Sequence, residues 1–215
     1  QECIKLWGIE EDVDCIVGFN GAMTQDFTLN KCQLNYPLTP AMQQEIINSF
    51  NTLDVNFMIY EPDGIYTQKV DAVSTRLSRN NHLPRFVLTD EILTHEHAKM
   101  LVTCPQEQMD QVMNILNNLH LDTIRGVRSQ PDLFEIFDAR NSKSRGIEQV
   151  ANYHGFKLDQ VMAFGDEDND LEMLEECGIG VAMANASSKA LAIADEVTAS
   201  NLEDGVAQRI EQYLK

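Results

Sequence analysis

Hydrophobic and polar positions follow a regular helix-strand order along the last third of the chain. Short apolar runs of strand length are separated by segments whose apolar positions recur at helical spacing. The predicted strands cover 161–164, 179–183 and 196–198, and the predicted helices cover 144–153, 169–176, 188–194 and 204–214. Because strands that alternate with helices are joined by crossover connections, this segment predicts a parallel sheet in an α/β fold.

The chain before residue 139 has a different, strand-rich pattern. An apolar strand over 14–19 ends at the turn signal Asn20-Gly21 and is expected to share the parallel sheet. Beyond it the pattern predicts a hairpin over 23–36, helices over 40–53 and 105–119, and strands over 56–60, 65–68, 99–103, 123–129 and 133–137. The segment 73–94 has no clear pattern.

Three parts follow from this change of pattern. Residues 1–22 are expected to be the N-terminal part of the layered α/β domain, and residues 139–215 its C-terminal part. Residues 23–138 are expected to form an inserted α+β domain.

An acidic loop follows the strand predicted over 161–164. Four of the five residues from Asp166 to Asp170 are acidic, and the loop lies where a strand ends and a helix begins, the usual ligand position in open α/β sheets. Asp166, Asn169 and Asp170 lie at i, i+3 and i+4, so they can share one face of the first helical turn. A hard divalent cation relieves their repulsion, and Mg²⁺ suits a site that also leaves room for phosphate.

This loop has two other interpretations. Acidic residues in a first helical turn also serve as capping groups that need no metal. The spacing of Asp166, Asp168 and Asp170 matches the start of an EF-hand calcium loop, but that loop then requires Gly and Glu where this chain has Leu171 and Cys177. The calcium interpretation is therefore rejected.

Lys143 lies where the predicted insert returns to the layered domain and a helix begins. The free N–H groups of a helix N-terminus favour anions, and a lysine adds a compact positive charge that suits phosphate. A solvated lysine at a helix start is the simpler interpretation of this residue alone. Together with the acidic loop, Lys143 completes the minimum needed to hold a phosphomonoester.

The overall charge limits the partners. The chain has 16 basic and 34 acidic residues, a formal net charge of −18, which argues against nucleic acid and against an anionic membrane surface. No apolar run approaches the roughly 18 residues of a membrane span, and no signal-peptide pattern opens the chain. The five scattered cysteines are typical of reduced thiols in a cytoplasmic protein.

The sequence contains two weaker motifs. Gly178-Ile-Gly180 suggests a dinucleotide site, but the third glycine is replaced by Met183 and the glycines precede the strand instead of following it. His95 and His97 could bind a metal, but no third ligand stands at suitable spacing, and exposed histidines on a strand are expected instead.

Taken together, the motifs resemble the Cof-type haloacid dehalogenase-like (HAD) phosphatases. They stand in the order of that family: Lys143, Gly165-Asp166-x-x-Asn169-Asp170, Gly178-Ile-Gly180-Val-Ala-Met-x-Asn185-Ala186, and 197–207. The resemblance is strong over 141–215 and looser at Asn20-Gly21-Ala22. It implies a HAD-like Rossmannoid parallel sheet with an inserted α+β cap.

The resemblance also implies a mechanism and site roles. A phosphoryl group would pass from a small phosphorylated metabolite to an enzyme aspartate and then to water, in a protein that is a monomer or homodimer. By position, Asp166 would bind Mg²⁺, with Asp170 as a metal-supporting carboxylate. Lys143 would bind the phosphate, and Asn169 would be a polar contact on its phosphate side.

The chain departs from that family in one respect. It has no Asp-x-Asp-Gly-Thr loop, which carries the nucleophile, and Asp12-Val-Asp14-Cys15 is rejected as a substitute because its apolar strand follows instead of preceding it. We therefore expect the sequence to be N-terminally truncated. Two hypotheses stay open: a phosphatase whose nucleophile lies upstream, and a non-catalytic protein that binds phosphate or a metabolite.

Overall fold

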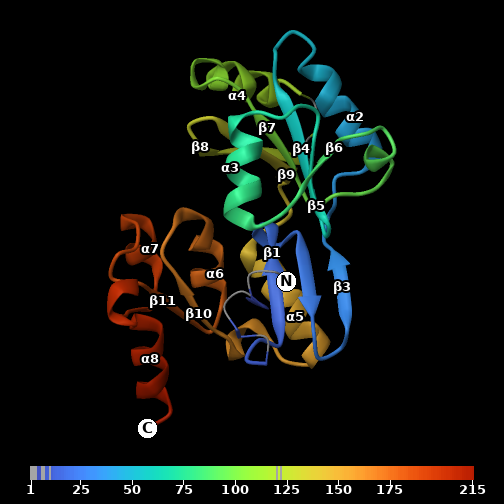
Figure 1. Cartoon of the computed structure of the whole chain (residues 1–215). Helices are drawn as coiled ribbons and strands as arrows, with labels where there is room; N and C mark the ends of the chain where they lie inside the picture. The colour runs from blue at the N-terminus through green and yellow to red at the C-terminus, as the bar shows by residue number, and fades with distance from the viewer. Residues whose placement is uncertain (1–3, 6–7, 10, 120, 122) are drawn as a thin grey trace. The chain divides into compact units, whose positions relative to one another are not determined.

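The computed structural model describes every residue except 1–3, 6, 7, 10, 120 and 122. The described chain forms two compact units, drawn in Figure 1. The first contains residues 34–140 and the described residues before Cys15, and the second contains residues 15–33 and 141–215. The second unit is therefore assembled from two stretches that are distant in the sequence.

A six-stranded sheet forms the centre of the first unit. Its strand order is β6-β5-β4-β7-β9-β8, with a parallel pair β5–β6 and antiparallel pairs elsewhere. The strands are β4 (Asn56–Glu61), β5 (Gly64–Thr67), β6 (Arg85–Val87), β7 (Met100–Thr103), β8 (Ile124–Gln130) and β9 (Leu133–Asp138).

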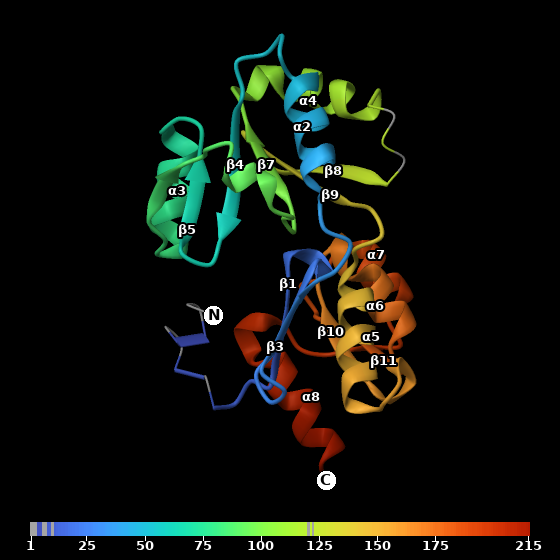
Figure 2. The same ribbon diagram turned by 90° about the vertical axis from the view of Figure 1, so that its right-hand side faces the viewer.

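Helices cover both faces of this sheet because successive strand residues point to opposite sides. Phe57 and Ile59 of β4 pack into a cluster with α2 (Pro40–Ser49) and α4 (Met109–Asn117). Met58, between them, packs into a second cluster with Val73 and Leu77 of α3 (Ala72–Asn81). Figure 2 shows α3 on one side of the sheet and α2 and α4 on the other. The unit has the predicted α+β character.

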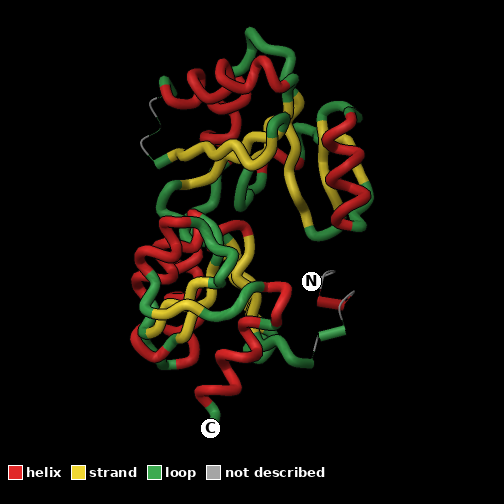
Figure 3. The backbone as a smooth tube through the Cα atoms, turned by 90° about the vertical axis from the view of Figure 1, so that its left-hand side faces the viewer, coloured by secondary structure: helices red, strands yellow, loops and turns green. Residues whose placement is uncertain are grey.

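The second unit contains two three-stranded sheets, shown in yellow in the lower half of Figure 3. One has the order β1 (Cys15–Gly18), β2 (Met23–Asp26) and β3 (Lys31–Leu34). The other is parallel, in the order β10 (Met162–Gly165), β11 (Ile179–Ala182) and β12 (Glu196–Val197). The parallel sheet confirms the predicted α/β class of this part.

Helix α5 (Lys143–His154) joins the two sheets. It packs against β1 and β2 and against α6 (Leu171–Glu176), which in turn contacts β10 and β11. The unit is completed by α7 (Ser188–Ile193) and α8 (Gly205–Tyr213). Since α5 begins at Lys143, the sequence interpretation of this residue as a helix start is confirmed.

The structure differs from the expected organisation in three places. β1 pairs antiparallel with β2 and not with the parallel sheet, because the hairpin that follows Gly21 returns directly alongside it. The same pairing places residues 23–33 in the second unit, so the boundary between the units falls at Leu34 and not at residue 23. The unassigned stretch 73–94 contains α3 and β6.

Two further findings concern the described residues only. Their helices are all too short or too polar to cross a membrane. None of their four cysteines, Cys15, Cys32, Cys104 and Cys177, forms a disulfide.

Candidate active site around the loop after β10

The acidic loop lies at the carboxyl end of the parallel sheet. It leaves β10 at Gly165, turns through a short 3₁₀ helix over Asp168–Asp170 and continues directly into α6. Gly165 pairs with Ala182 of β11, so the segments that follow these two strands start side by side. This is why Asp166 meets residues near Asn185, although they are distant in the sequence.

Asp170 connects Lys143 to this loop. Its Oδ1 lies 2.5 Å from Lys143 Nζ, and its Oδ2 accepts hydrogen bonds of 3.1 Å from the backbone N–H groups of Asp166 and Glu167. The Asp170 residue is only 3% exposed, and these three donors compensate for burying its charge. The arrangement needs glycine at 165, since a Cβ there would lie 2.6 Å from Asp170 Cβ.

The carboxylate of Asp166 has fewer hydrogen-bond partners than that of Asp170. Its Oδ2 accepts one long hydrogen bond of 3.5 Å from Asn185 Nδ2, while its backbone carbonyl accepts from Ser187 N at 2.8 Å. Asn185 is held in turn by the N–H of Asn201, which donates to Asn185 Oδ1 at 3.0 Å. No basic side chain in the described part of the chain pairs with Asp166.

The side chain of Asp168 contacts two residues at the start of α7. Ser187 Oγ donates to its Oδ1 at 3.0 Å, and Lys189 Nζ lies 2.5 Å from its Oδ2. The hydrogen bond from Lys189, followed by that from Ser187, lowers the pKa of Asp168. Both partners lie at the start of α7, so Asp168 ties the acidic loop to that helix.

Asn169 reaches the end of β1. Its Nδ2 donates to Asn20 Oδ1 at 3.1 Å. Asn20 has a φ of 55°, in the left-handed region that asparagine tolerates better than most residues. The close approach of this turn to α5 requires Gly21, because a Cβ there would lie 1.8 Å from the carbonyl oxygen of Ser142. The end of β1, the start of α5 and the acidic loop thus lie beside one another.

The loop retains negative charge after these pairings. It carries four carboxylates, at residues 166, 167, 168 and 170, and two lysines contact it, which leaves two negative charges (4 − 2). A divalent cation balances that charge, and the carboxylate of Asp166 is the oxygen ligand with the fewest competing partners. The donor set therefore fits a Mg²⁺ ion.

The structure brings the sequence-derived candidates together to different degrees. Lys143 and Asp170 are in direct contact, and Asp166 and Asn169 belong to the same loop. Asp170 has both oxygens engaged, so its role as a metal-supporting group stays a prediction. Asn20 and Lys189 received no site role from the sequence, although Lys189 directly follows the Ser187-Ser188 helix start.

The glycines near β11 have a packing explanation. A Cβ at Gly180 would lie 1.9 Å from the carbonyl oxygen of Leu174 in α6, and one at Gly178 would lie 2.0 Å from the carbonyl oxygen of Asp159. Close backbone contacts account for both glycines.

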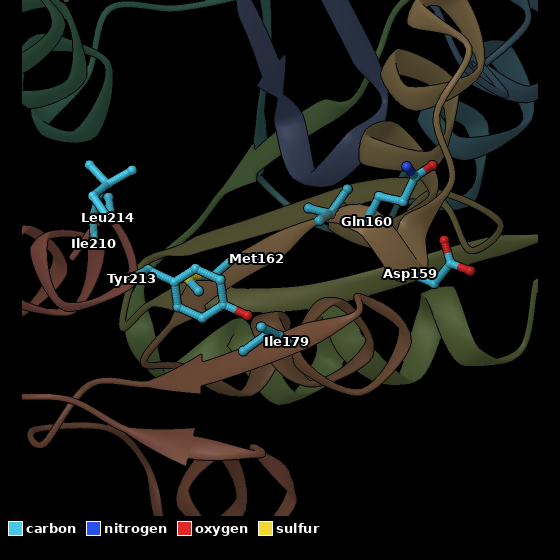
Figure 4. Close-up of a pocket in the computed structure, with 8 residues that line it drawn as sticks. Asp159, Gln160, Met162, Ile179, Ile210, Tyr213 and Leu214 are labelled. Carbon is cyan, nitrogen blue, oxygen red and sulfur yellow. The ribbon is translucent and has the colours of Figure 1, made fainter.

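An apolar cavity of about 370 Å³ lies at the other end of β10. Figure 4 shows Met162 of β10, Ile179 of β11 and Tyr213 of α8 among its lining residues. Tyr213 and the neighbouring Leu214 are strongly exposed. β10 is also the end strand of its sheet. This surface is apolar enough to be covered by a further segment.

Known proteins resemble this chain over most of its length. The family model for haloacid dehalogenase-like hydrolases matches residues 2–210. The 5-amino-6-(5-phospho-D-ribitylamino)uracil phosphatase YitU of Bacillus subtilis is 31% identical over 212 residues, which cover 93% of this chain and 76% of that protein.

Two solved structures have the same fold. A haloacid dehalogenase-like hydrolase from Bacteroides thetaiotaomicron matches with a TM-score of 0.88 at 24% identity, covering 99% of this chain and 81% of its own. TM0651 from Thermotoga maritima matches with a TM-score of 0.80 at 27% identity, covering 90% of this chain and 73% of its own.

Proposed function

The chain belongs to the haloacid dehalogenase-like hydrolase family, and on that premise we propose that it hydrolyses small phosphorylated metabolites with the aid of Mg²⁺. The observation that carries the proposal is the loop after β10. There an uncompensated carboxylate, that of Asp166, lies in the same loop as the carboxylate that holds Lys143. A metal-binding carboxylate and a fixed ammonium group are what a phosphomonoester requires.

Each residue has a distinct role in this proposal. Asp166 holds the metal, which when bound offsets the negative charge of the phosphoryl group. Lys143 neutralises a phosphate oxygen, and Asp170 positions Lys143 through the contact at 2.5 Å. Asn169 donates an amide N–H on the phosphate side, and its contact with Asn20 sets the orientation of its side chain.

The nucleophile is proposed to be a carboxylate in a segment outside these 215 residues. In the first step the phosphoryl group leaves the ester oxygen of the substrate and bonds to that carboxylate. In the second step water takes the phosphoryl group, which releases inorganic phosphate and restores the carboxylate. Two observations support this segment: β10 ends its sheet, and an apolar cavity lies at the start of that strand. A strand paired in parallel with β10 would end beside Asp166.

The substrate class follows from the named relative and the charge of the site. YitU is named as a phosphatase of 5-amino-6-(5-phospho-D-ribitylamino)uracil, in which a ribityl group carries the phosphate. We propose a sugar phosphate or a similar phosphomonoester for this chain.

The metal assignment is tested by binding, independently of turnover. Mn²⁺ serves as a paramagnetic probe for the Mg²⁺ site, and its binding to the 215-residue chain is followed by electron paramagnetic resonance. We expect Asp166→Asn to weaken binding at least tenfold. Glu175→Gln removes an exposed carboxylate from nearby α6 and serves as the matched control. Equal affinities for all three proteins would refute the assignment of Asp166.

A second candidate is a protein that binds phosphate or a metabolite without turnover. It is favoured by one observation, that the 215 residues contain no Asp-x-Asp-Gly-Thr loop. The upstream coding sequence separates the two candidates. An in-frame apolar strand followed by that loop supports the phosphatase, whereas a start codon without it supports the binding protein.

A further inference from the structure

A second cluster of metal-ligating side chains lies in the second unit, away from the acidic loop. It consists of Cys15, Asp26 and His154, and one ligand atom of each lies within 4.8 Å of the others. His154 ends α5, whereas Lys143 begins it. Because a helix of 12 residues is about 18 Å long, the cluster is well separated from the proposed Mg²⁺ site.

The fold brings these three residues together by register. Cys15 and Asp26 are direct partners in the antiparallel β1–β2 pair, so their side chains project from the same face of the sheet. Helix α5 packs on both strands and brings His154 to that face. Figure 1 shows α5 alongside this hairpin.

The three ligand atoms converge on one point. His154 Nε2 lies 2.6 Å from Asp26 Oδ2 and 3.9 Å from Cys15 Sγ. Asp26 is fully buried, and its other oxygen, Oδ1, accepts hydrogen bonds of 2.8 Å from Thr28 Oγ1 and Leu29 N. These hydrogen bonds fix the carboxylate of Asp26 with its Oδ2 directed toward the imidazole and the thiol.

The geometry distinguishes this cluster from a nucleophilic triad. In a Cys-His-Asp triad one ring nitrogen faces the nucleophile and the other faces the carboxylate. Here Nε2 faces both, so the imidazole cannot take a proton from the thiol while donating to Asp26. A His-Asp ion pair with the Cys15 thiol hydrogen-bonded to the same carboxylate is the competing explanation, and it needs no metal. The three ligand atoms, all within 4.8 Å of one another, also have the arrangement of metal ligands.

We propose that Cys15, Asp26 and His154 bind Zn²⁺ or a divalent ion of similar softness. Thiolate, imidazole and carboxylate are the ligands that Zn²⁺ prefers, usually in tetrahedral coordination. In that geometry a nitrogen and an oxygen bound at about 2.0 Å are about 3.3 Å apart, and a sulfur bound at about 2.3 Å lies about 3.5 Å from the nitrogen. The observed 2.6 and 3.9 Å therefore need only small side-chain shifts. The His154 side chain is 29% exposed, which leaves access for a water as fourth ligand.

Such an ion would crosslink the β1–β2 hairpin to the end of α5. Its role is structural, because it lies at the opposite end of α5 from Lys143. The proposal is independent of the phosphatase function.

Co²⁺ is the probe for this site, since thiolate coordination gives it a characteristic charge-transfer absorption. The reduced, tag-free 215-residue chain is titrated with Co²⁺ after chelator treatment, and Zn²⁺ is then added. We expect one Co²⁺ per chain with that absorption, followed by displacement by Zn²⁺. Cys15→Ser should abolish the absorption, and His154→Gln should weaken binding at least tenfold.

Controls separate this site from other thiols and from the acidic loop. Cys32→Ser removes an exposed thiol from neighbouring β3, and Asp166→Asn removes the proposed Mg²⁺ ligand. Both should keep the absorption. Circular dichroism checks that each variant is folded, and the buried Asp26 is left unchanged for that reason. No absorption in the unsubstituted chain, or its persistence in folded Cys15→Ser, would overturn the proposal and leave a structural ion pair only.

Discussion

Among the residues that the structure describes, Asp170 is the one that holds the ammonium group of Lys143. Asp170 contacts its ammonium group and also anchors the backbone of the acidic loop, so one buried carboxylate organises both parts of the candidate site. A substitution at Asp170 should therefore disturb both Lys143 and the backbone of the acidic loop.

The first prediction concerns these two residues, in a chain extended upstream and shown to be active. Lys143→Ala should lower kcat/KM by about 10²–10³, because a charge that stabilises the transition state is lost. Asp170→Asn should lower kcat more than it changes KM, since Lys143 stays present but loses its anchor. Lys157→Ala, at an exposed position before β10, is the control. Steady-state kinetics that rank Lys157→Ala with Lys143→Ala would contradict the assignment.

The residues of the site differ in how far the sequence could predict them. The acidic loop and Lys143 could be found from the sequence because each stands directly beside a predicted strand end or helix start, which is a local signal. His97 was expected to be exposed but is 2% exposed, between Gln43 Oε1 at 3.0 Å and Glu61 Oε1 at 2.8 Å. Burial, followed by the charge of His95, lowers its pKa to about 4. Those partners are distant in the sequence, so no local pattern could reveal them.

At the scale of elements, α3 shows why a short helix can lack a recognisable apolar periodicity in its sequence. Only Val73, Ser74 and Leu77 are buried along its ten residues, which is too few for a clear apolar stripe. Its ends carry better signals. Asp71 and Ser74 form a capping box, His82 closes the helix in a left-handed conformation, and Pro84 follows. The longer helices and the central strands were predictable because they bury a full face.

The second prediction concerns the cap of α3. Asp71 accepts hydrogen bonds from Ser74 N at 2.6 Å, and from Asn56 Nδ2 and Thr103 Oγ1 at 2.7 Å each. Asp71→Ala should therefore lower the free energy of unfolding by about 2–4 kcal/mol, because a cap is lost and buried polar groups lose their acceptor. Urea denaturation at neutral pH measures this loss. Asp110→Asn, in the exposed first turn of α4, should change it little.

The contribution of Asp71 to the free energy of unfolding should also depend on pH, and the direction follows from its pKa. Burial raises its pKa, but the hydrogen bonds outweigh burial and bring it below the ordinary value of 3.8. A carboxyl group with a lowered pKa stabilises the fold above that value, and the contribution is lost as the pH falls through the lowered pKa. The gap between Asp71→Ala and the unsubstituted chain should therefore narrow in acid. A gap that widens below pH 4 would contradict this account.

At the scale of the whole molecule, the third prediction concerns turnover by these 215 residues. With Mg²⁺ and p-nitrophenyl phosphate they should show no appreciable phosphatase activity, because a metal ligand and a lysine cannot form an aspartyl-phosphate. A chain extended upstream by the proposed nucleophile segment should be active under the same conditions. Mg²⁺-dependent turnover by the 215 residues alone would show that the proposed upstream nucleophile is not needed.

The fold class was predictable as a whole, but the grouping of its elements was not. The change of pattern near residue 141 correctly separated a parallel α/β segment from an α+β segment. The hairpin β2–β3 was assigned to the wrong side of that division, because its polar alternation does not reveal that it pairs with β1. Which strands pair depends on contacts between distant parts of the chain, whereas a sequence pattern indicates only which face of a strand is apolar.

The second unit is built from two stretches that are distant in the sequence, and this affects how it forms during synthesis. Its β1–β2 hairpin leaves the ribosome well before β10, from Asp26 to Met162, an interval of 136 residues (162 − 26). At roughly 5–20 residues per second that interval lasts about 7–27 s. Residues 34–140 form a continuous stretch with their own sheet and can fold within it. For most of that time the nascent hairpin lacks α5, which packs against both of its strands, so this is the period in which a chaperone has most to protect.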